Sequence, residues 1–455
     1  MPQIPVSLRV PTRIALLLLI ATGVTLHVVV FWIAHFPEPR QWMGDEPMYL
    51  EGGQTLASGQ TWSYESLWPP FQPVFLALIL RLTGGSLLAV EIVQTLLLLL
   101  AAYLLSEISR SITGSRQVGW ISGSLMLIYP TFAGFAHFLW PEILHLTAYL
   151  ATGWILLHRR HSFGWLFGAG LLLGVTLSSK YLLWPLLLVA LPILLFRVRK
   201  GVRRRLAIVA SGALMVLGIV YSSDRLQVKK YPMVESAVFN AWVGLHDTSR
   251  KDFVDPIVGQ YFRRYIEAPS VRERNELMWA EIVAEGREVG WLRLLARQAG
   301  RQYFRLLDKD TFLTDQLPGG VIAESGRGFQ GTPRHVAKLL KAWSYGLYGA
   351  VLVLATVGAI VFPIARRSWS RALLSVLGFA LLVFLVSHVK SRFRLQFEPI
   401  LFLYTGCAVS WIAARIGWTS DEIELWDRRP GTRQWLAAAA VASVLLFLAF
   451  GRPLL

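Results

Sequence analysis

The sequence predicts an all-α, multi-pass membrane protein, and three observations support this prediction. Of the 455 residues, 54% are hydrophobic and only 16% are charged, whereas soluble domains carry about 25% charged residues. The mean hydropathy is +0.49. The apolar residues also come in runs of about 17–25, the length that crosses about 30 Å of hydrocarbon as a helix.

These runs predict about eleven transmembrane helices. The first follows Arg9 and Arg13, as a secretory signal would. It is longer than a typical signal and no small-x-small cleavage site follows, so we interpret it as a retained span. The expected spans are residues 13–34, 86–108, 117–135, 141–158, 164–178, 181–197, 206–222, 342–364, 372–388, 396–414 and 435–450.

Lys and Arg are distributed unevenly among the connecting loops. With the N-terminus in the cytoplasm, the inner loops hold roughly nineteen basic residues and the short outer loops roughly six, as the positive-inside rule requires. Loops that face anionic headgroups therefore explain the formal charge of +17, and we exclude nucleic-acid binding. We expect a cytoplasmic N-terminus, and the Arg-rich chain suggests a bacterial inner membrane.

Two outer segments are too long to be simple connectors. Residues 35–85 include an apolar run, Gln72–Leu82, which is too short to span and is expected to lie flat at the interface. Residues 223–340 are charged, with helical patterning around Ser270–Leu307, and we expect a helical loop domain or lid there. The predicted parts are thus an N-terminal transmembrane module (1–222), the outer loop domain (223–340) and a C-terminal transmembrane module (341–455).

The most informative segment begins just outside the first span. Gly44-Asp45-Glu46-Pro47-Met48-Tyr49-Leu50-Glu51 holds three carboxylates, and its proline predicts the first turn of a helix. Acidic residues also stabilise a helix N-terminus, so a structural role stays open. Their place at the outer membrane edge favours a carboxylate that removes a proton from an acceptor hydroxyl or amine.

A second segment, Ser387–Pro399, enters the tenth expected span from the outer side. It carries four potential cations, His388, Lys390, Arg392 and Arg394, against the positive-inside trend. Arginine makes strong bidentate hydrogen bonds with phosphate. Phosphate binding is one interpretation, and anchoring to lipid headgroups is the alternative.

Further ionisable residues lie at the ends of spans. Glu142 opens the fourth expected span, with His137 before it and His145 one turn later, and Lys180 lies at the outer end of the fifth. Ionisable residues at such depths are functional candidates, but an ion pair of Glu142 with Lys180 or an arginine is an equal alternative. The two histidines and Glu142 make only a weak metal-site pattern. We expect no cofactor, and a divalent metal stays open as the alternative.

Aromatic residues gather in or near the outer loops, where they fit either an interfacial belt or a sugar-stacking surface. They are Trp62, Tyr64, Trp68, Phe71 and Trp140.

Small residues in the spans predict packing. The only cysteine, Cys407, lies in an apolar run, so no disulfide within the chain is possible and we expect a small core residue. Two GxxxG steps, Gly164/Gly168 and Gly170/Gly174, predict close helix contact.

Together these segments resemble the GT-C membrane glycosyltransferases, particularly the protein O-mannosyltransferases and the lipid A aminoarabinose transferases. Asp45-Glu46-x-x-Tyr49-x-Glu51 followed by Leu56–Trp62 is similar to the first outer loop of that family. Pro69-Pro70 with Phe75–Leu82 and Gly84 resembles its next element, and Arg392-Phe393-Arg394-Leu395 with Glu398-Pro399 its late Arg-rich stretch. The likeness covers most of residues 10–200 and 370–415.

The resemblance implies a GT-C-like helical bundle that transfers a sugar from a polyprenyl-phosphate donor with inversion. It implies Asp45 as catalytic base, with Glu46 orienting the acceptor or supporting Asp45. Relatives often have a basic residue just before the Pro-Pro step, where this chain has Trp68. The expected substrate-binding residues are Tyr49, Glu51, Glu142, Lys180, His388, Arg392 and Arg394, with Lys180 and the two arginines holding the phosphate.

Two other function classes stay open. A secondary transporter or lipid flippase would show inverted repeats and broken helices at the midplane, and the sequence has no matching halves. A polysaccharide polymerase or ligase would use a lipid-diphosphate glycan, and Arg-rich outer loops would suit it too. The sequence identifies neither the sugar nor the acceptor, which could be a glycan, a lipid or a protein.

Overall fold

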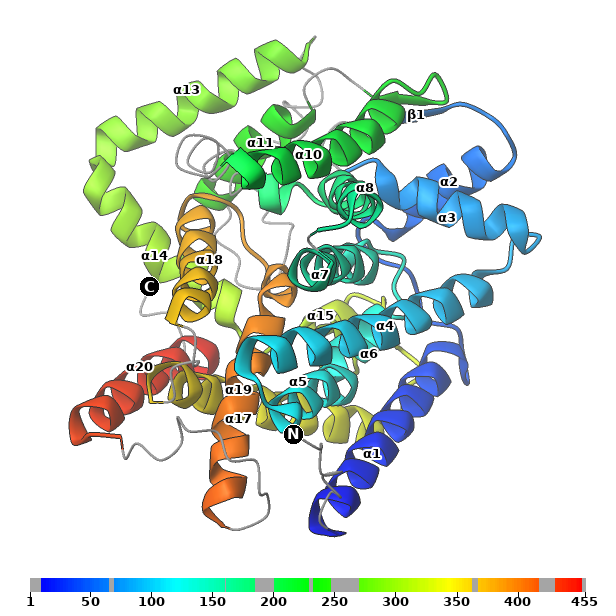
Figure 1. Cartoon of the computed structure of the whole chain (residues 1–455). Helices are drawn as coiled ribbons and strands as arrows, with labels where there is room; N and C mark the ends of the chain where they lie inside the picture. Colours follow the sequence, from blue (N-terminus) through cyan, green and yellow to red (C-terminus); the bar gives the residue numbers. More distant parts are fainter. Residues whose placement is uncertain are drawn as a thin grey trace.

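The computed structural model describes residues 10–64, 69–159, 161–184, 200–228, 232–246, 270–361, 367–416 and 430–451. These residues form helices almost entirely, and two short strands pair in parallel (Figure 1). The elements are α1 (Val10–His35), α2 (Glu46–Ala57), β1 (Trp62–Tyr64), α3 (Phe71–Leu82), α4 (Leu87–Thr113), α5 (Arg116–Ile128), α6 (Pro130–Phe135), α7 (Glu142–His158), α8 (Phe163–Ser179), η1 (Tyr181–Leu183), α10 (Lys200–Tyr221), β2 (Leu226–Val228), α11 (Pro232–His246), α13 (Val271–Val289), α14 (Trp291–Leu307), α15 (Phe312–Gln316), α16 (Val321–Glu324), α17 (Arg334–Ile360), α18 (Arg367–Val386), η2 (Ser391–Gln396), α19 (Glu398–Arg415) and α20 (Thr432–Phe450).

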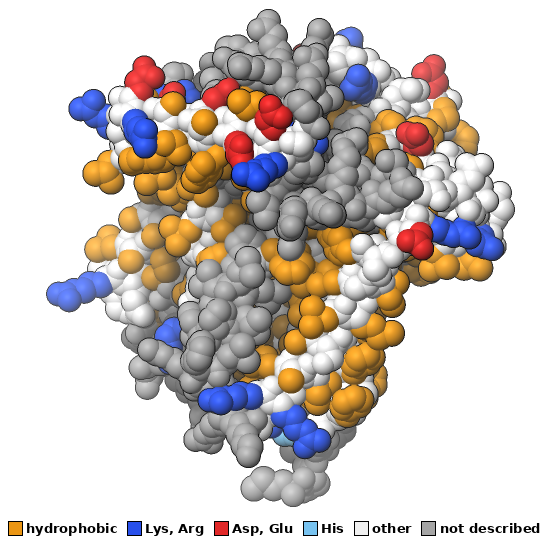
Figure 2. Space-filling view, turned by 90° about the horizontal axis from the view of Figure 1, so that it is seen from above, with side chains coloured by type: hydrophobic (Ala, Val, Ile, Leu, Met, Phe, Trp, Pro, Cys, Tyr) orange, Lys and Arg blue, Asp and Glu red, His pale blue; other side chains and the backbone are white. Residues whose placement is uncertain are grey.

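Six of the described helices, α1, α4, α10, α17, α18 and α20, are long and apolar enough to cross a membrane. Their outer faces expose large apolar side chains, such as Leu17 and Leu18, which are 65% and 63% exposed. Figure 2 shows apolar side chains spread over one face, with acidic side chains in the upper part of the view and Lys or Arg also near its lower edge. The predicted all-α, multi-pass membrane fold is therefore confirmed.

The other expected spans are shorter than these six helices, are interrupted or are more deeply buried. The span 117–135 is divided between α5 and α6, because Pro130 lacks an N–H and restricts the residue before it. α7 and α8 have 17 residues each, and α19 is an 18-residue helix whose side chains are mostly buried, among them Cys407. The expected span 181–197 lies mostly outside the described residues, and its start forms η1.

α8 and α10 approach each other closely through small residues. A Cβ atom on Gly170 would lie 2.2 Å from the carbonyl oxygen of Val209, and one on Gly174 would lie 2.6 Å from a side-chain atom of α10. The helix contact predicted for this GxxxG step is confirmed. For the other step, a Cβ on Gly164 or Gly168 would meet no heavy atom of the described residues within 4 Å, so the contact predicted there stays a prediction.

The two long outer segments contain the predicted short helices. The run Gln72–Leu82 lies in α3, which packs beside α2 (Figure 1). Ser270–Leu307 forms α13 and α14, and Ser270 caps α13 by accepting a hydrogen bond from Glu273 N at 3.2 Å. The parallel pair β1–β2 connects the two outer segments, with Trp62 opposite Leu226.

The largest apolar core among the described residues joins α1, α4, α5, α6, α7 and α17 with the first outer segment. Its fully buried aromatic rings include Phe132, Phe135, Phe138 and Trp140. Edge-to-face contacts between such rings restrict their orientation, so the short stretch 136–141 between α6 and α7 is firmly positioned. This stretch contacts the candidate site described next.

Candidate active site

Asp45 occupies the N-cap position of α2. Gly44 before it has φ of +57°, a conformation that glycine adopts without strain, and Pro47 lies in the first turn as predicted. An N-cap aspartate normally accepts a hydrogen bond from the first turn, but Asp45 makes no such bond. Its Oδ2 instead lies 3.4 Å from Nη2 of Arg392. Helix capping therefore does not account for this carboxylate.

Arg392, in η2, lies against three aromatic rings from separate segments. Its guanidinium carbon is 4.5 Å from the ring centroid of Trp140, 5.1 Å from that of Phe312 and 5.4 Å from that of Phe393. A cation–π contact that is shielded from water contributes about 2 kcal/mol. The rings thus fix the guanidinium plane beside Asp45, while 17% of the side chain stays exposed.

Lys180 donates a hydrogen bond to Oε1 of Glu142 at 3.0 Å, so the ion pair considered from the sequence is present. The two side chains are only 12% and 3% exposed. Burial lowers the pKa of Lys180, and Arg392 lowers it too, whereas Glu142 and Asp45 raise it. This pair is therefore electrostatically connected with the Asp45–Arg392 pair.

Tyr49, one turn into α2, is buried and interacts electrostatically with members of both ion pairs. Burial raises the pKa of its phenol well above the usual value, the Asp45 and Glu142 charges raise it further, and Arg392 opposes them. The hydroxyl therefore stays protonated and can donate a hydrogen bond. Glu51, by contrast, is exposed on the surface of α2. We use the name Asp45 cluster for Asp45, Tyr49, Glu142, Lys180 and Arg392.

Glu46 is fully buried and binds groups in the interior of the protein. Its oxygens accept hydrogen bonds from Arg40 at 2.9 and 2.5 Å, and from the backbone N–H groups of Met43 at 3.0 Å and Leu139 at 2.9 Å. Glu46 therefore holds the loop that carries Asp45, which fits the expected support of Asp45 and not the expected contact with the acceptor. Sequence reasoning missed Arg40, since no local pattern distinguishes it.

Arg394 is likewise committed to internal contacts. Its Nε donates to Oε1 of Glu398 at 2.8 Å, and its Nη1 donates to the carbonyl oxygens of Leu306, at 3.3 Å, and Asp308. The guanidinium carbon lies 3.9 Å from the ring centroid of Tyr348. Arg394 joins the end of α14 to the start of α19, so the predicted phosphate contact does not fit this geometry.

Basic residues of two distant segments gather near Arg392. The ring of His388 interacts electrostatically with Lys390, Arg305 and Arg392, and its backbone N–H donates to the carbonyl oxygen of Asn240 on α11 at 2.6 Å. His388 and Lys390 belong to the Ser387–Pro399 segment, whereas Arg305 is a buried residue of α14. Only the fold brings this arginine close, and no sequence motif pointed to it.

The predicted aromatic group divides between two places. Trp140 supports Arg392 in the Asp45 cluster, whereas Trp62 and Phe71 belong to a separate apolar cluster beside α10. The side chain of Tyr64 and all of Trp68 lie outside the described residues, so the sugar-stacking prediction stays a prediction.

The weak metal pattern of the sequence does not form. Glu142 pairs with Lys180, and Nδ1 of His145 lies 3.0 Å from the carbonyl oxygen of Thr176. His137 belongs to another group of side chains, considered below.

Comparisons with known proteins agree with this picture. Residues 68–222 match the family described as dolichyl-phosphate-mannose-protein mannosyltransferase. The match supports a GT-C membrane glycosyltransferase. The matched segment contains Glu142 and Lys180, and the match confirms the resemblance that the motifs predicted. No curated protein gave a match.

Two solved structures are similar to the chain over nearly its whole length. The archaeal oligosaccharyltransferase AglB from Archaeoglobus fulgidus, in complex with an inhibitory peptide and a dolichol-phosphate, has 13% identity and a TM-score of 0.44, with 94% of this chain and 54% of that chain covered. ArnT from Cupriavidus metallidurans, bound to undecaprenyl phosphate, has 15% identity and a TM-score of 0.38, with 95% and 88% covered. The chain thus spans about half of the archaeal enzyme.

Proposed function

We propose that this glycosyltransferase moves one sugar from a polyprenyl-monophosphate donor to a hydroxyl or amine acceptor, with inversion. The reaction takes place at the non-cytoplasmic face of the membrane. The observation that carries the proposal is the 3.4 Å contact between the Asp45 carboxylate and the Arg392 guanidinium. Displacement of a phosphate by an acceptor needs a base and a phosphate-binding cation near one point. The matched family, whose donor is a lipid-monophosphate sugar by its description, supports the same donor class.

Asp45 acts as the base in this scheme. As the acceptor oxygen or nitrogen bonds to the anomeric carbon, its proton passes to the Asp45 carboxylate. The bond between the anomeric carbon and the phosphate oxygen breaks, and its electron pair leaves with the polyprenyl phosphate. Attack from the face opposite the phosphate inverts the anomeric configuration.

Arg392 and Lys180 stabilise the charge that develops on the leaving phosphate. Each now faces a carboxylate, Asp45 or Glu142, and a phosphate oxygen can take over part of each contact. Because aromatic rings and the ion pairs hold these cations in advance, little reorganisation is needed in the transition state. The planar guanidinium also allows two parallel hydrogen bonds to phosphate.

The membrane supplies the donor in this proposal. A polyprenyl chain stays in the bilayer while its phosphate reaches the site at the interface. The asymmetry of Lys and Arg in the loops supports a cytoplasmic N-terminus, which puts Asp45, directly after α1, on the outer side. A bacterial inner membrane is the proposed location.

The test uses the full chain purified in lipid nanodiscs, radiolabelled polyprenyl-monophosphate sugars and a membrane extract as acceptor. Wild type, Asp45→Asn and Glu38→Gln are compared, since Glu38 is an exposed carboxylate of the same loop. We expect transfer by wild type and Glu38→Gln only. Full activity of Asp45→Asn would exclude it as base, and transfer from lipid-diphosphate glycans alone would favour the polymerase or ligase class.

A further inference from the structure

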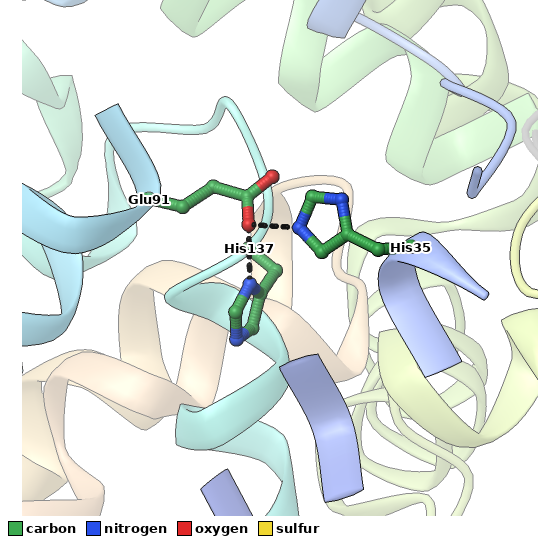
Figure 3. A group of neighbouring side chains, drawn as sticks. All are labelled: His35, Glu91 and His137. Carbon is green, nitrogen blue, oxygen red and sulfur yellow. Dashed lines mark hydrogen bonds and ion pairs between the residues drawn. The ribbon is translucent and has the colours of Figure 1, made fainter. Parts of the chain in front are cut away.

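A separate cluster brings three metal-ligating side chains together, as Figure 3 shows. His35 is the last residue of α1, Glu91 lies near the start of α4, and His137 lies in the turn after α6. Their ligand atoms lie within 4.8 Å of one another. Segments more than forty residues apart thus place two imidazoles and one carboxylate at one point.

The spacing of these atoms is close to that of a metal site. Oε2 of Glu91 lies 2.9 Å from Nε2 of His35 and 2.7 Å from Nδ1 of His137. Nitrogen and oxygen ligands at about 2.0–2.2 Å from a tetrahedral zinc ion are separated by about 3.3–3.5 Å. Shifts of about 1 Å or less per side chain therefore convert the cluster into a three-ligand site.

The cluster is closed on one side and accessible on the other. The side chain of His137 is 4% exposed, that of Glu91 15%, and that of His35 29%. An ion can therefore enter past His35 and keep one position for water. Three protein ligands with one open position is a common arrangement for zinc.

The position of His137 is fixed from a neighbouring turn of α4. Gln94, less than one turn after Glu91, donates hydrogen bonds to the carbonyl oxygens of Ala136, at 3.1 Å, and Phe138, at 2.9 Å. Such contacts around a ligand orient it and commonly change metal affinity by about 10–100-fold. α4 therefore supplies one ligand directly and holds a second in place.

We infer that His35, Glu91 and His137 bind a divalent transition metal, with Zn²⁺ as the best match. Two imidazoles favour zinc and its neighbours over Mg²⁺ and Ca²⁺, which prefer oxygen ligands. The single carboxylate, with two neutral imidazoles, also offsets part of the charge of a divalent ion. The inference is independent of the proposed sugar transfer.

The bound ion would position the loop that carries Asp45. His35 directly precedes this loop, and the carbonyl oxygen of His137 accepts a hydrogen bond from Arg40 at 3.2 Å. Arg40 in turn pairs with Glu46, next to Asp45. A metal therefore links the end of α1 to the same turn through which Arg40 supports the Asp45 loop.

The first experiment measures metal binding by the full chain in nanodiscs. The protein is stripped with a chelator, and Zn²⁺, Mg²⁺ or buffer is added before thermal unfolding. We expect Zn²⁺ to raise the unfolding temperature by several degrees and Mg²⁺ to leave it unchanged, because a ligand that binds only the folded state stabilises it. This comparison uses wild type alone, so it does not depend on how a variant folds.

The second experiment assigns the ligands. Zinc content and the visible d–d absorption of added Co²⁺ are measured for wild type, Glu91→Gln, His137→Gln and the control His158→Gln, whose exposed imidazole lies at the C-terminal end of α7. We expect about one zinc per chain in wild type and the control, and a loss of at least about tenfold in affinity in both site variants.

The inference is overturned by either of two outcomes. The first is no zinc-dependent shift of the unfolding temperature in wild type. The second is equal zinc content and equal Co²⁺ spectra in wild type and Glu91→Gln. In both cases Glu91 would only accept hydrogen bonds from the two histidines.

Discussion

The Asp45 carboxylate lies 3.4 Å from the Arg392 guanidinium, although 347 positions separate the two residues in the chain. Asp45 follows the first transmembrane helix, and Arg392 precedes the helix α19. The first and last thirds of the chain therefore meet at one point. Neither part contains a complete site on its own, so changes on either side are expected to affect the same reaction.

We expect Arg392→Ala to lower kcat/KM for the lipid donor by roughly 10²–10³-fold, as the loss of one preorganised charge-stabilising donor typically does. Arg392→Lys should recover only part of this, because lysine lacks the planar fork that binds phosphate through two hydrogen bonds. Steady-state kinetics with varied donor measure both effects. Arg272→Ala, at an exposed arginine of α13, is the control, and equal losses in all three variants would contradict the assignment.

Breaking the Arg40–Glu46 pair should destabilise the protein strongly. Both side chains are at most 5% exposed, and removing one partner of a buried ion pair costs about 3–5 kcal/mol because the other charge is left without compensation. We therefore expect Glu46→Gln to lower the unfolding temperature. Arg40→Met combined with Glu46→Leu should recover part of the loss, and a double variant as unstable as the sum of the single variants would contradict this explanation.

The pH profile of activity tests the Lys180–Glu142 pair. Lys180 carries its charge only below its pKa, which burial lowers and Glu142 raises. Glu142→Gln removes the raising charge, so the pKa of Lys180 falls and activity should be lost at a lower pH on the alkaline side. Arg392 and Asp45, the other charged groups that act on Lys180, stay in place.

Profiles of kcat/KM against pH for wild type and Glu142→Gln provide this measurement. Glu38→Gln, at an exposed carboxylate outside the Asp45 cluster, controls for the loss of one negative charge. Coincident alkaline limbs in wild type and Glu142→Gln would show that Lys180 does not need its charge for the reaction.

Local patterns in the sequence pointed to both Asp45 and Arg392, and the structure brings these two side chains within 3.4 Å. Carboxylates at a helix start directly after a span, and cations against the positive-inside trend, are both visible within a few residues. Partner choice is not local. Arg392 and Arg394 have the same side chain and lie in one 3₁₀ helix. Such a helix has about three residues per turn, so side chains two positions apart point about two-thirds of a turn away from each other. One therefore faces Asp45, while the other faces Glu398.

Contacts between distant segments explain the residues that sequence reasoning missed. Arg40 lies in a loop and Arg305 on an ordinary amphipathic helix, so neither departs from its local background. Arg40 also donates hydrogen bonds to the distant Gln316 and to the carbonyl oxygen of His137. Arg305 interacts with His388, more than eighty positions away in the chain. The break at Pro130 was missed for another reason, since the apolar run continues across it and hydropathy alone reports no interruption.

Two glycines of α8 allow a matched test of helix packing. A Cβ on Gly170 would lie 2.2 Å from the backbone oxygen of Val209, whereas one on Gly168 would meet no heavy atom of the described residues within 4 Å. We expect Gly170→Ala to force α8 and α10 apart and to cost about 1–3 kcal/mol, as overpacking does. Gly168→Ala should be neutral or stabilising by up to about 1 kcal/mol, because alanine favours the helix.

Unfolding of both variants and wild type in the same lipid measures these opposite signs. Each variant adds one methyl group to the same helix, two residues apart, so helix propensity and apolar content change equally. The difference between them therefore isolates the contact with α10. If the two variants shifted the unfolding temperature equally, α8 and α10 would not be in backbone contact at Gly170.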